Sequence, residues 1–274
     1  TQTVYDLESA RAFSAAAQAA GRRLRIHVKA DTGMSRLGWL CNEGHRTEAA
    51  DAIAAVCALP GLEAEGIYTH FANADGDEAY TMGQFTRFLE LLSELEGRGI
   101  TFPIRHCAAS AAVLKYPCTH LDMVRPGVAL YGHYPDPSCE GLDGVGLRPV
   151  MALKTRVASV KAVPAGTPVS YGCTHVLERD AELAALTVGY ADGLPRLCSD
   201  RLEVLIRGQR APIVGRVCMD MCMADATGLG AAPGDEVELF GEHLPVEDAA
   251  ALAGTIQYEL LCAVSPRVPR EYLN

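Results

Sequence analysis

The sequence has no run of basic residues, and its 34 Asp and Glu outnumber its 24 Lys and Arg. The formal net charge of −10 leaves no basic stripe along which a phosphate backbone could bind, so we expect no nucleic-acid partner. No apolar stretch approaches the roughly 20 residues that a membrane helix needs. No basic-then-apolar signal segment opens the printed sequence. We therefore expect a soluble, cytoplasmic protein.

Metal and disulfide signatures are also missing. The ten cysteines are scattered without paired C-x-x-C motifs, and the eight histidines show no H-E-x-x-H spacing. These patterns predict reduced thiols and no metal site. What is present is a chain of 274 residues, 49% of them hydrophobic, which can bury the core of one large domain or two smaller ones.

The first half of the chain alternates helical and strand patterns. Helical periodicity marks residues 4–21, 48–59, 82–99 and 111–115, and short apolar runs mark strands at 24–30, 66–70, 104–108 and 121–132. This alternation predicts parallel β/α units, in either a doubly wound sheet or an eight-fold barrel. A barrel is favoured because it gathers its chemistry where strands end, and polar residues stand at those points: Lys29, Arg36, His70, Ser110 and Arg125.

After about residue 145 the pattern changes to short β-branched runs separated by Gly, Pro and Asp. One clear helix is expected there, beginning after Pro245. We predict two domains, residues 1–144 in the barrel and 145–274 in the β-rich part. The fold class is therefore α/β plus β, with a partial (β/α)8 TIM-type barrel followed by a C-terminal β-rich domain.

The start of the chain raises a further expectation. The sequence opens at Thr1 within a helical pattern, with no strand predicted before it, and only four strands are predicted in the barrel. Four β/α units cannot close a barrel, and their open edges would promote aggregation. We therefore expect further protein upstream of Thr1.

Eight stretches, in order along nearly the whole chain, resemble the alanine racemase family of pyridoxal-phosphate enzymes. They are "HVKADTGMSRLGW", "GIYTHFANAD", "HCAASAAVLKYP", "MVRPGVALYG", "VSYG", "VGYADGLPR", "IVGRVCMDMCM" and "TIQYELLCAVSPRVPR". The resemblance implies a barrel that binds pyridoxal 5′-phosphate and a C-terminal β domain. It also implies a homodimer whose active sites are shared between subunits, so that the β domain of one completes the barrel site of the other.

Racemisation needs two bases that flank the reacting carbon. In the family these are a lysine that also holds the cofactor and a tyrosine, which the resemblance places at Tyr171. None of the four lysines matches the cofactor lysine. We therefore expect a missing N-terminal segment and an isolated chain that is inactive. A phenol has a pKa near 10, so Tyr171 needs stabilising neighbours, for which the resemblance offers His70 and Arg125.

Arginine stays protonated, and the resemblance places Arg125 against the pyridine nitrogen of the cofactor. It also implies that Lys29 is carbamylated, which converts an ammonium into an anion that can pair with Arg36. Arg36 is then aimed at the cofactor oxygen and the substrate carboxylate. The alternative is an unmodified Lys29 in a wet acidic cleft.

The remaining site residues also come from the resemblance. Phosphate binding is assigned to Ser110, Gly127, Val128 and Tyr258, although Ala109 stands where the family commonly has asparagine. The substrate pocket is assigned to Cys218, Met219, Asp220 and Tyr190, and the entry corridor further includes Asp75, Arg196 and Arg216.

Tyr258 and Met219 leave room for little more than a methyl group, which favours L- and D-alanine as substrates and a role in peptidoglycan supply. The alternatives are a non-catalytic half of a split racemase that binds a partner, a serine racemase of the same family, and a pyridoxal-phosphate decarboxylase of similar plan.

Overall fold

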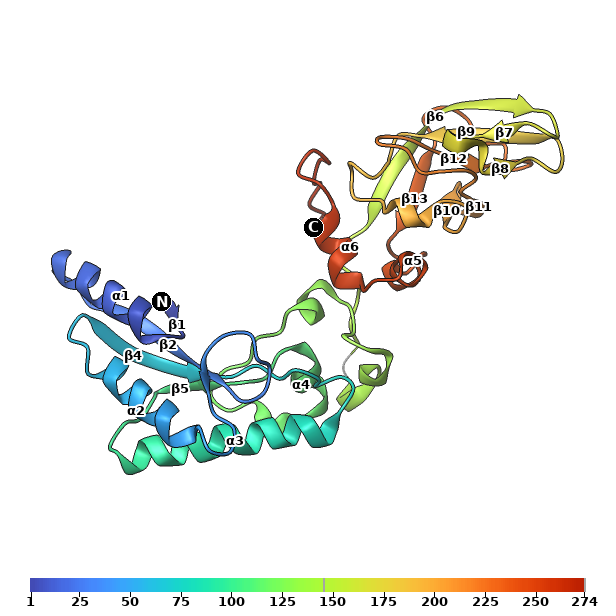
Figure 1. The fold of residues 1–274 in the computed structure, drawn as a ribbon. Helices are drawn as coiled ribbons and strands as arrows, with labels where there is room; N and C mark the ends of the chain where they lie inside the picture. The colour runs from blue at the N-terminus through green and yellow to red at the C-terminus, as the bar shows by residue number, and fades with distance from the viewer. Residues whose placement is uncertain (145, 274) are drawn as a thin grey trace. The chain divides into compact units, whose positions relative to one another are not determined.

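The computed structural model describes residues 1–144 and 146–273, and it divides into two compact units, Thr1–Arg148 and Pro149–Asn274 (Figure 1). The predicted boundary between residues 144 and 145 involves Val145, which lies outside the described residues. Within the described ranges, no helix is both long enough and apolar enough to cross a membrane.

The first unit is built on parallel strands in sequence order. These are β1 (Gln2–Val4), β2 (Leu24–Asp31), β4 (Leu62–Tyr68) and β5 (Ile104–His106), with β3 (Trp39–Leu40) paired in parallel to the end of β2. The connecting helices are α1 (Leu7–Ala19), α2 (Arg46–Cys57), α3 (Glu78–Gly97) and α4 (Ser110–Lys115). A doubly wound sheet reverses its strand order at a switch point, whereas this order runs on without reversal, as in a barrel.

The longest helix shows how this unit is held together. Asp77 caps the start of α3 by accepting a 2.9 Å hydrogen bond from the Tyr80 amide. Apolar residues at helical spacing then bury one face of α3 in the core: Phe85, Phe88, Leu91 and Leu95. Helices α1 and α2 pack side by side, as do α2 and α3, so the helices form a row outside the strands.

Two expectations for this unit were wrong. Strand β1 precedes the first helix and pairs with Ile26–Val28 of β2, but three residues are too few to show a strand pattern. Residues 121–132 do not form a regular strand. Arg125 makes only an isolated parallel bridge to Ala109, because Pro126 lacks the N–H that would continue the ladder. Val128–Tyr131 forms a 3₁₀ helix instead.

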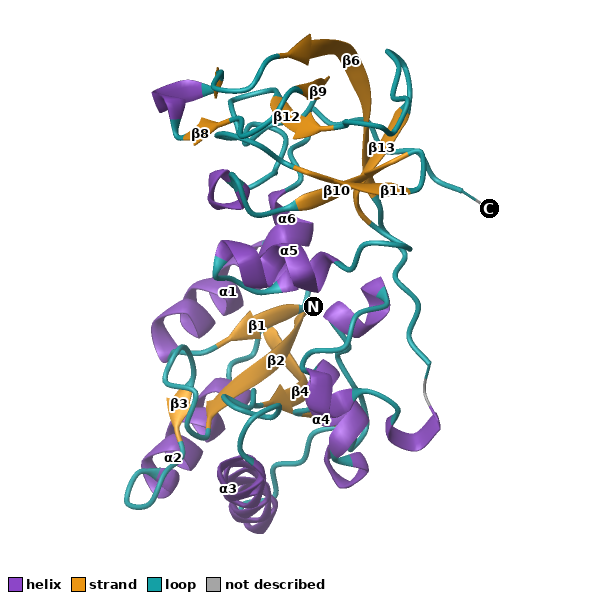
Figure 2. Ribbon diagram, turned by 90° about the vertical axis from the view of Figure 1, so that its right-hand side faces the viewer, coloured by secondary structure: helices purple, strands orange, loops and turns teal. Residues whose placement is uncertain are grey.

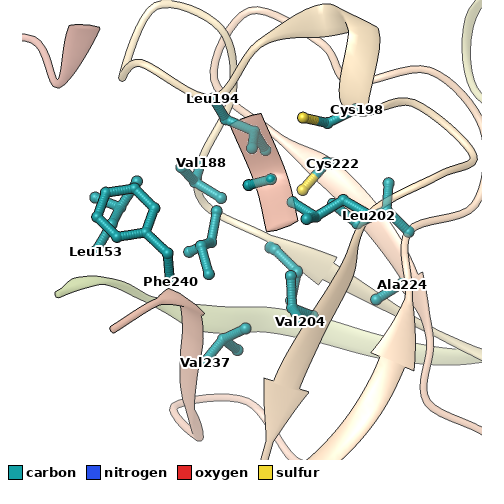
Figure 3. Close-up of a cluster of buried hydrophobic side chains, with 14 of the residues drawn as sticks. Leu153, Val188, Leu194, Cys198, Leu202, Val204, Cys222, Ala224, Val237 and Phe240 are labelled. Carbon is teal, nitrogen blue, oxygen red and sulfur yellow. The ribbon is translucent and has the colours of Figure 1, made fainter. Parts of the chain in front are cut away.

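The second unit is a six-stranded antiparallel sheet in the order β11-β10-β13-β6-β9-β12 (Figure 2). Its strands are β6 (Leu153–Val163), β9 (Ala181–Leu186), β10 (Glu203–Ile206), β11 (Gln209–Pro212), β12 (Cys222–Asp225) and β13 (Glu236–Phe240). A separate ribbon pairs β7 (Pro168–Val169) with β8 (His175–Val176). Buried apolar side chains from the sheet and its loops, among them Leu153, Val188, Val204, Cys222 and Phe240, form the core (Figure 3).

Helix α5 (Val246–Ala253) begins after Pro245, as predicted. The expectation of one helix was wrong, because α6 (Gln257–Ala263) follows it. Helix α6 has only seven residues, which is too short for a clear helical periodicity in the sequence. The short 3₁₀ helices are η1 (Pro117–Thr119), η2 (Val128–Tyr131), η3 (Pro137–Cys139), η4 (Leu142–Gly144), η5 (Tyr171–Cys173) and η6 (Arg196–Cys198). Together the two units confirm the predicted fold class of a partial barrel followed by a β-rich domain.

Candidate active site

The Asp-Thr-Gly turn after β2 is fixed by one buried carboxylate. Oδ1 of Asp31 accepts three backbone N–H bonds of 3.0–3.1 Å, from Gly33, Met34 and Ser35. Such a carboxylate organises a turn without any regular ladder. The aspartate in this motif therefore shapes the loop that carries Arg36.

Gly38 brings that loop back onto Lys29. It has a φ of +111°, and a Cβ there would lie 2.5 Å from the carbonyl oxygen of Lys29, so only glycine fits. The charge of the exposed Arg36 acts on Lys29 and helps to lower its pKa. The two cations are thus brought together by the turn and by this close approach.

Lys29 is a buried lysine, with 5% of its surface exposed. Its Nζ donates a 2.9 Å hydrogen bond to the Ala30 carbonyl and lies 5.1 Å from the centre of the Tyr68 ring. Burial, followed by the charges of Arg125 and Arg36, outweighs the opposing effect of Asp31 and lowers the pKa of Lys29 to about 8. A substantial fraction of the amine is therefore neutral near physiological pH.

Arg125 lies at the ends of β4 and β5, where its guanidinium is held by several acceptors at once. Nη1 donates to Nδ1 of His106, and Nη2 lies 3.0 Å from the Thr69 carbonyl, 3.3 Å from the Cys107 carbonyl and 3.3 Å from Nδ1 of His70. Burial lowers the pKa of Arg125 below its ordinary value, yet an arginine remains a cation. The result is a fixed positive charge with a fixed direction.

Two histidines beside Arg125 are held neutral. Burial, then the charge of Arg125, lowers the pKa of His70 to about 4 and that of His106 to about 3. The His106 ring stacks on Tyr68 with centres 4.7 Å apart, and its Nε2 lies 2.7 Å from Nδ1 of His27. His70 therefore sits in a network of neutral rings around one cation.

Sequence reasoning missed His106, His27 and Tyr68, which belong to this network. The register pairs Lys29 with Tyr68 and Tyr68 with His106, so these three side chains form one row across β2, β4 and β5. One signal was available for His27, because it alternates with Lys29 and Asp31 along β2 and so shares their face. The row of Lys29, Tyr68 and His106 depends on the register between three strands, which the sequence does not give.

Three of the four predicted phosphate residues, Ser110, Gly127 and Val128, lie together beyond β5. Ser110 begins α4 and is buried, and its Oγ accepts hydrogen bonds from the amides of Gly127 at 2.7 Å and Ala129 at 3.3 Å. Val128, at the start of η2, is also buried. Ala109 occupies the N-cap of α4 and gives no side-chain cap, so the departure from asparagine has a local structural effect.

In the second unit, Tyr171 stands in η5 with 71% of its surface exposed. The neighbouring Ser170 donates a 2.7 Å hydrogen bond from its Oγ to the Arg216 carbonyl. A Cβ at Gly172 would lie 3.1 Å from Nη1 of Arg216, so the loop that carries Tyr171 packs directly on the 215–218 segment.

The pocket residues predicted for this unit lie on that same segment. The Tyr190 amide donates to the Cys218 carbonyl at 3.0 Å, and the Ala191 amide to the Met219 carbonyl at 2.8 Å. The chain then turns through the exposed Met219 and Asp220, closed by a 2.8 Å bond from the Cys218 amide to the Met221 carbonyl. Tyr258 lies separately on α6. The structure thus brings Tyr190 and the residues Cys218, Met219 and Asp220 together, and it leaves Tyr258 apart from them.

The other three lysines have surroundings of their own. Nζ of Lys115 donates to the Asp75 carbonyl at 2.8 Å, Lys154 pairs with Glu236 at 2.7 Å, and Lys161 lies exposed on β6. Among the described residues, no group of three or more His, Cys, Asp or Glu side chains could hold a metal ion.

Comparisons with known proteins agree on one family. A family model described as "Alanine racemase, N-terminal domain" matches residues 1–135, and one described as "Alanine racemase, C-terminal domain" matches residues 150–272. The chain is 49% identical to an alanine racemase of Desulforamulus reducens, with all of this chain and 74% of the relative covered. It is 48% identical to one of Desulfovibrio desulfuricans, with all of this chain and 73% of the relative covered.

Solved structures give the same result. An alanine racemase of Clostridium difficile 630 matches with a TM-score of 0.92 and 38% identity, over all of this chain and 70% of that one. The alanine racemase of a D-cycloserine-producing Streptomyces lavendulae matches with a TM-score of 0.92 and 39% identity, over 99% of this chain and 72% of that one.

Proposed function

The chain belongs to the alanine racemase family, and from this premise we propose that it interconverts L- and D-alanine with pyridoxal 5′-phosphate as cofactor. The observation that carries the proposal is the fixed guanidinium of Arg125. It is directed by two carbonyls and two imidazoles, and a cation held in this way can donate a hydrogen bond to a pyridine nitrogen without losing its proton.

The residues beside Arg125 fit the cofactor. The Ser110 hydroxyl and the backbone at Gly127 and Val128 are polar, close together and placed at the start of a helical turn, as phosphate sites often are. We assign the ring nitrogen to Arg125 and the phosphate to Ser110, Gly127, Val128 and Tyr258. When bound, the cofactor supplies the electron sink that stabilises negative charge at the substrate Cα.

Tyr171 acts as one of the two bases in this proposal. Arginine has donors only, so the contact of Arg125 with Nδ1 of His70 makes that nitrogen the acceptor and places the proton of neutral His70 on Nε2. In the proposed dimer His70 and Arg125 then serve as the network that stabilises negative charge on the oxygen of Tyr171. Tyr171 holds and returns the proton at Cα, and a lysine acts on the opposite face, as in the family.

Lys29 serves as a carbamate in this proposal. The neutral amine of Lys29 adds to the carbon of CO2, a C–O π bond opens to give the carbamate oxygen anion, and the amine releases one proton to water. The lowered pKa of Lys29 makes the neutral amine available. The carbamate replaces the like-charge contact with Arg36 by an ion pair, which holds Arg36 toward the cofactor and the substrate carboxylate.

Cys218, Met219, Asp220 and Tyr190 line the substrate pocket in the proposed assembly, with Tyr258 limiting its size to a methyl group. The protein acts as a homodimer in which the β unit of one subunit serves the barrel of the other, with domains at 1–144 and 145–274. A cytoplasmic location and a role in peptidoglycan supply stay predictions, although the ten free thiols fit a reducing compartment.

The expectation that a segment is missing before Thr1 gains no support from the family match, because the N-terminal domain model already covers residues 1–135. No finding supports the expected inactivity of the isolated chain. Both stay predictions, together with the split-racemase and serine racemase alternatives.

The test is incubation of the purified protein with pyridoxal 5′-phosphate and L-alanine, with chiral chromatography of the product. When the cofactor lysine is present, we expect D-alanine to accumulate until both enantiomers are equal, because enantiomers have equal free energies in water. For the 274-residue chain alone the prediction of inactivity stands. Faster turnover of serine would favour a serine racemase, and CO2 release would indicate a decarboxylase. Activity that appears only after a separate lysine-bearing segment is added would favour the split racemase.

A further inference from the structure

Ser170, the residue immediately before Tyr171, has a backbone conformation that side-chain-bearing residues rarely adopt. Its φ is +63° and its ψ is −173°. This region is occupied almost only by glycine, and other residues persist there when their surroundings enforce it. The surroundings of Ser170 must therefore hold the backbone next to the proposed base in this conformation.

Contacts with three residues of the 215–218 segment enforce the strained conformation. Oγ of Ser170 donates a 2.7 Å hydrogen bond to the Arg216 carbonyl and lies 3.5 Å from Sγ of Cys218. Gly215 approaches from the same loop, where a Cβ would lie 2.8 Å from Cβ of Ser170 and 2.8 Å from the Val169 carbonyl oxygen. The strand end before Tyr171 is thus pressed against the 215–218 segment and tied to it.

The chain that follows Tyr171 is also anchored to the 215–218 segment, at His175. Nδ1 of His175 pairs with Oδ1 of Asp200 at 2.9 Å, and that oxygen also accepts a hydrogen bond from the Gly215 amide. Between these anchors the Tyr171 side chain is 71% exposed, so its own unit packs little of the ring. The direction of the phenol is therefore set mainly by the backbone.

We propose that Ser170 is a positioning residue for Tyr171: its hydroxyl holds the chain in a strained conformation that aims the phenol. The proposal rests on the proposed function, in which Tyr171 is a base. Glycine could adopt the conformation freely but would also leave it freely. Alanine would keep the strain and lose the anchor. Of these three residues, only serine both restricts the backbone and makes the hydrogen bond to the Arg216 carbonyl that holds it in place.

The first test compares melting temperatures of Ser170→Gly and Ser170→Ala. A matched pair, Ser159→Gly and Ser159→Ala, serves as control, because Ser159 is an exposed residue inside strand β6. In a strand, alanine is more stable than glycine, so Ser159→Ala should melt higher than Ser159→Gly. At position 170 we expect the reverse order, with the glycine variant higher by about 2 °C or more. Equal melting temperatures of Ser170→Gly and Ser170→Ala, or a higher one for Ser170→Ala, would contradict the inference that the backbone at Ser170 is strained.

The second test measures hydrogen–deuterium exchange of the Tyr171–Thr174 amides in the same four proteins. Loss of the anchor should speed exchange there about tenfold or more in both Ser170 variants and leave it unchanged in both Ser159 variants. Unchanged exchange in Ser170→Gly would overturn the positioning role.

The third test is kinetic and uses the active protein with its cofactor. Ser170→Gly should be more stable than Ser170→Ala and yet have a kcat about tenfold below that of the parent, with little change in KM, because a misdirected base weakens the chemical step. An unchanged kcat would overturn the proposal. If the parent protein racemises no amino acid, the proposed function fails, while the melting order and the exchange rates still decide whether Ser170 fixes the loop.

Discussion

Nε2 of His106 lies 2.7 Å from Nδ1 of His27, and Arg125 determines which ring donates in this bond. Arginine cannot accept, so Nδ1 of His106 must accept from Arg125 and the proton of neutral His106 sits on Nε2. His106 then donates to His27, which carries its own proton on Nε2, 3.3 Å from a carboxylate oxygen of Glu65. One cation thereby fixes the tautomers of a chain of rings that ends at a carboxylate.

This arrangement predicts loss of stability in mild acid. The pKa values of His70 and His106, about 4 and about 3, lie below their ordinary value of 6.5. As pH falls below 6.5, the unfolded chain takes up protons that the folded protein refuses, so stability is full above that pH and falls toward the two lowered values. Urea midpoints measured from pH 7 to pH 4 should therefore decrease.

His70→Gln tests the origin of that decrease, because glutamine keeps a neutral polar side chain but does not titrate. Its urea midpoint should depend less on pH than that of the parent over the same range. Identical pH dependence in the two proteins would show that His70 does not cause the loss.

Lys29 should carry a CO2-derived carbamate in bicarbonate buffer. With a pKa of about 8, its reactive neutral form increases as pH rises through 8. NMR with ¹³C-labelled bicarbonate should show a carbamate signal that grows over this range and is absent in Lys29→Met. Lys154 is the internal control, because Glu236 raises its pKa and keeps it protonated. A signal that survives Lys29→Met, or none in the parent, contradicts the prediction.

Gln84 should contribute to stability by linking two loops of the barrel unit. This fully buried amide accepts a 2.8 Å hydrogen bond from the Ala72 amide and donates to Oγ1 of Thr32 and the His70 carbonyl, both at 3.2 Å. Gln84→Leu keeps much of the volume but removes these three hydrogen bonds, although Oγ1 of Thr32 keeps its 2.7 Å bond to Oγ1 of Thr69. We expect a loss of about 1–3 kcal/mol in the free energy of unfolding, measured by urea denaturation.

Gln18→Leu is the matched control for this substitution, because Gln18 is an exposed residue of α1. Its effect should stay within about 0.5 kcal/mol. A similar loss in both variants would mean that the bonds of Gln84 contribute nothing specific.

The sequence predicted those parts of the fold whose signal is local. Strand β2 and helix α3 have long regular patterns, and Pro245 marks the start of α5, so each was found. Strand β1 was missed because its three residues are defined by pairing with β2 and not by their own pattern.

Some residues of the candidate site could likewise be predicted from the sequence, and others could not. The polar residues at strand ends were predictable because parallel strands end at one edge. The row of Lys29, Tyr68 and His106 was not, because it depends on the register between strands. The conformation of Ser170 was also hidden, since no sequence pattern requires serine at a positive φ.

Ala109→Asn should stabilise the barrel unit. Ala109 is the N-cap of α4, with φ −100° and ψ −175°, and it provides no side-chain hydrogen bond to the helix start. Asparagine in this extended conformation can accept from an amide of the first turn, which contributes about 0.5–2 kcal/mol. Urea denaturation should show the gain, and Ala109→Ser, which also caps, should reproduce part of it. A loss in both variants would mean that the side chain has no room there.

Tyr171→Phe should slow racemisation strongly while leaving the fold intact. The ring is 71% exposed, so loss of its hydroxyl removes no buried contact, and the melting temperature should match that of Tyr272→Phe, a control at a residue 91% exposed. Removal of one of two bases should lower kcat about 10²–10⁴-fold.

Isotope exchange in D2O separates a lost base from a damaged site. With one base left, the Tyr171→Phe variant should still exchange the α-hydrogen of one alanine enantiomer without inverting it, because only one face retains a proton acceptor. The parent should exchange and invert both. Full racemisation by Tyr171→Phe, or equal exchange of both enantiomers, would remove Tyr171 from the mechanism.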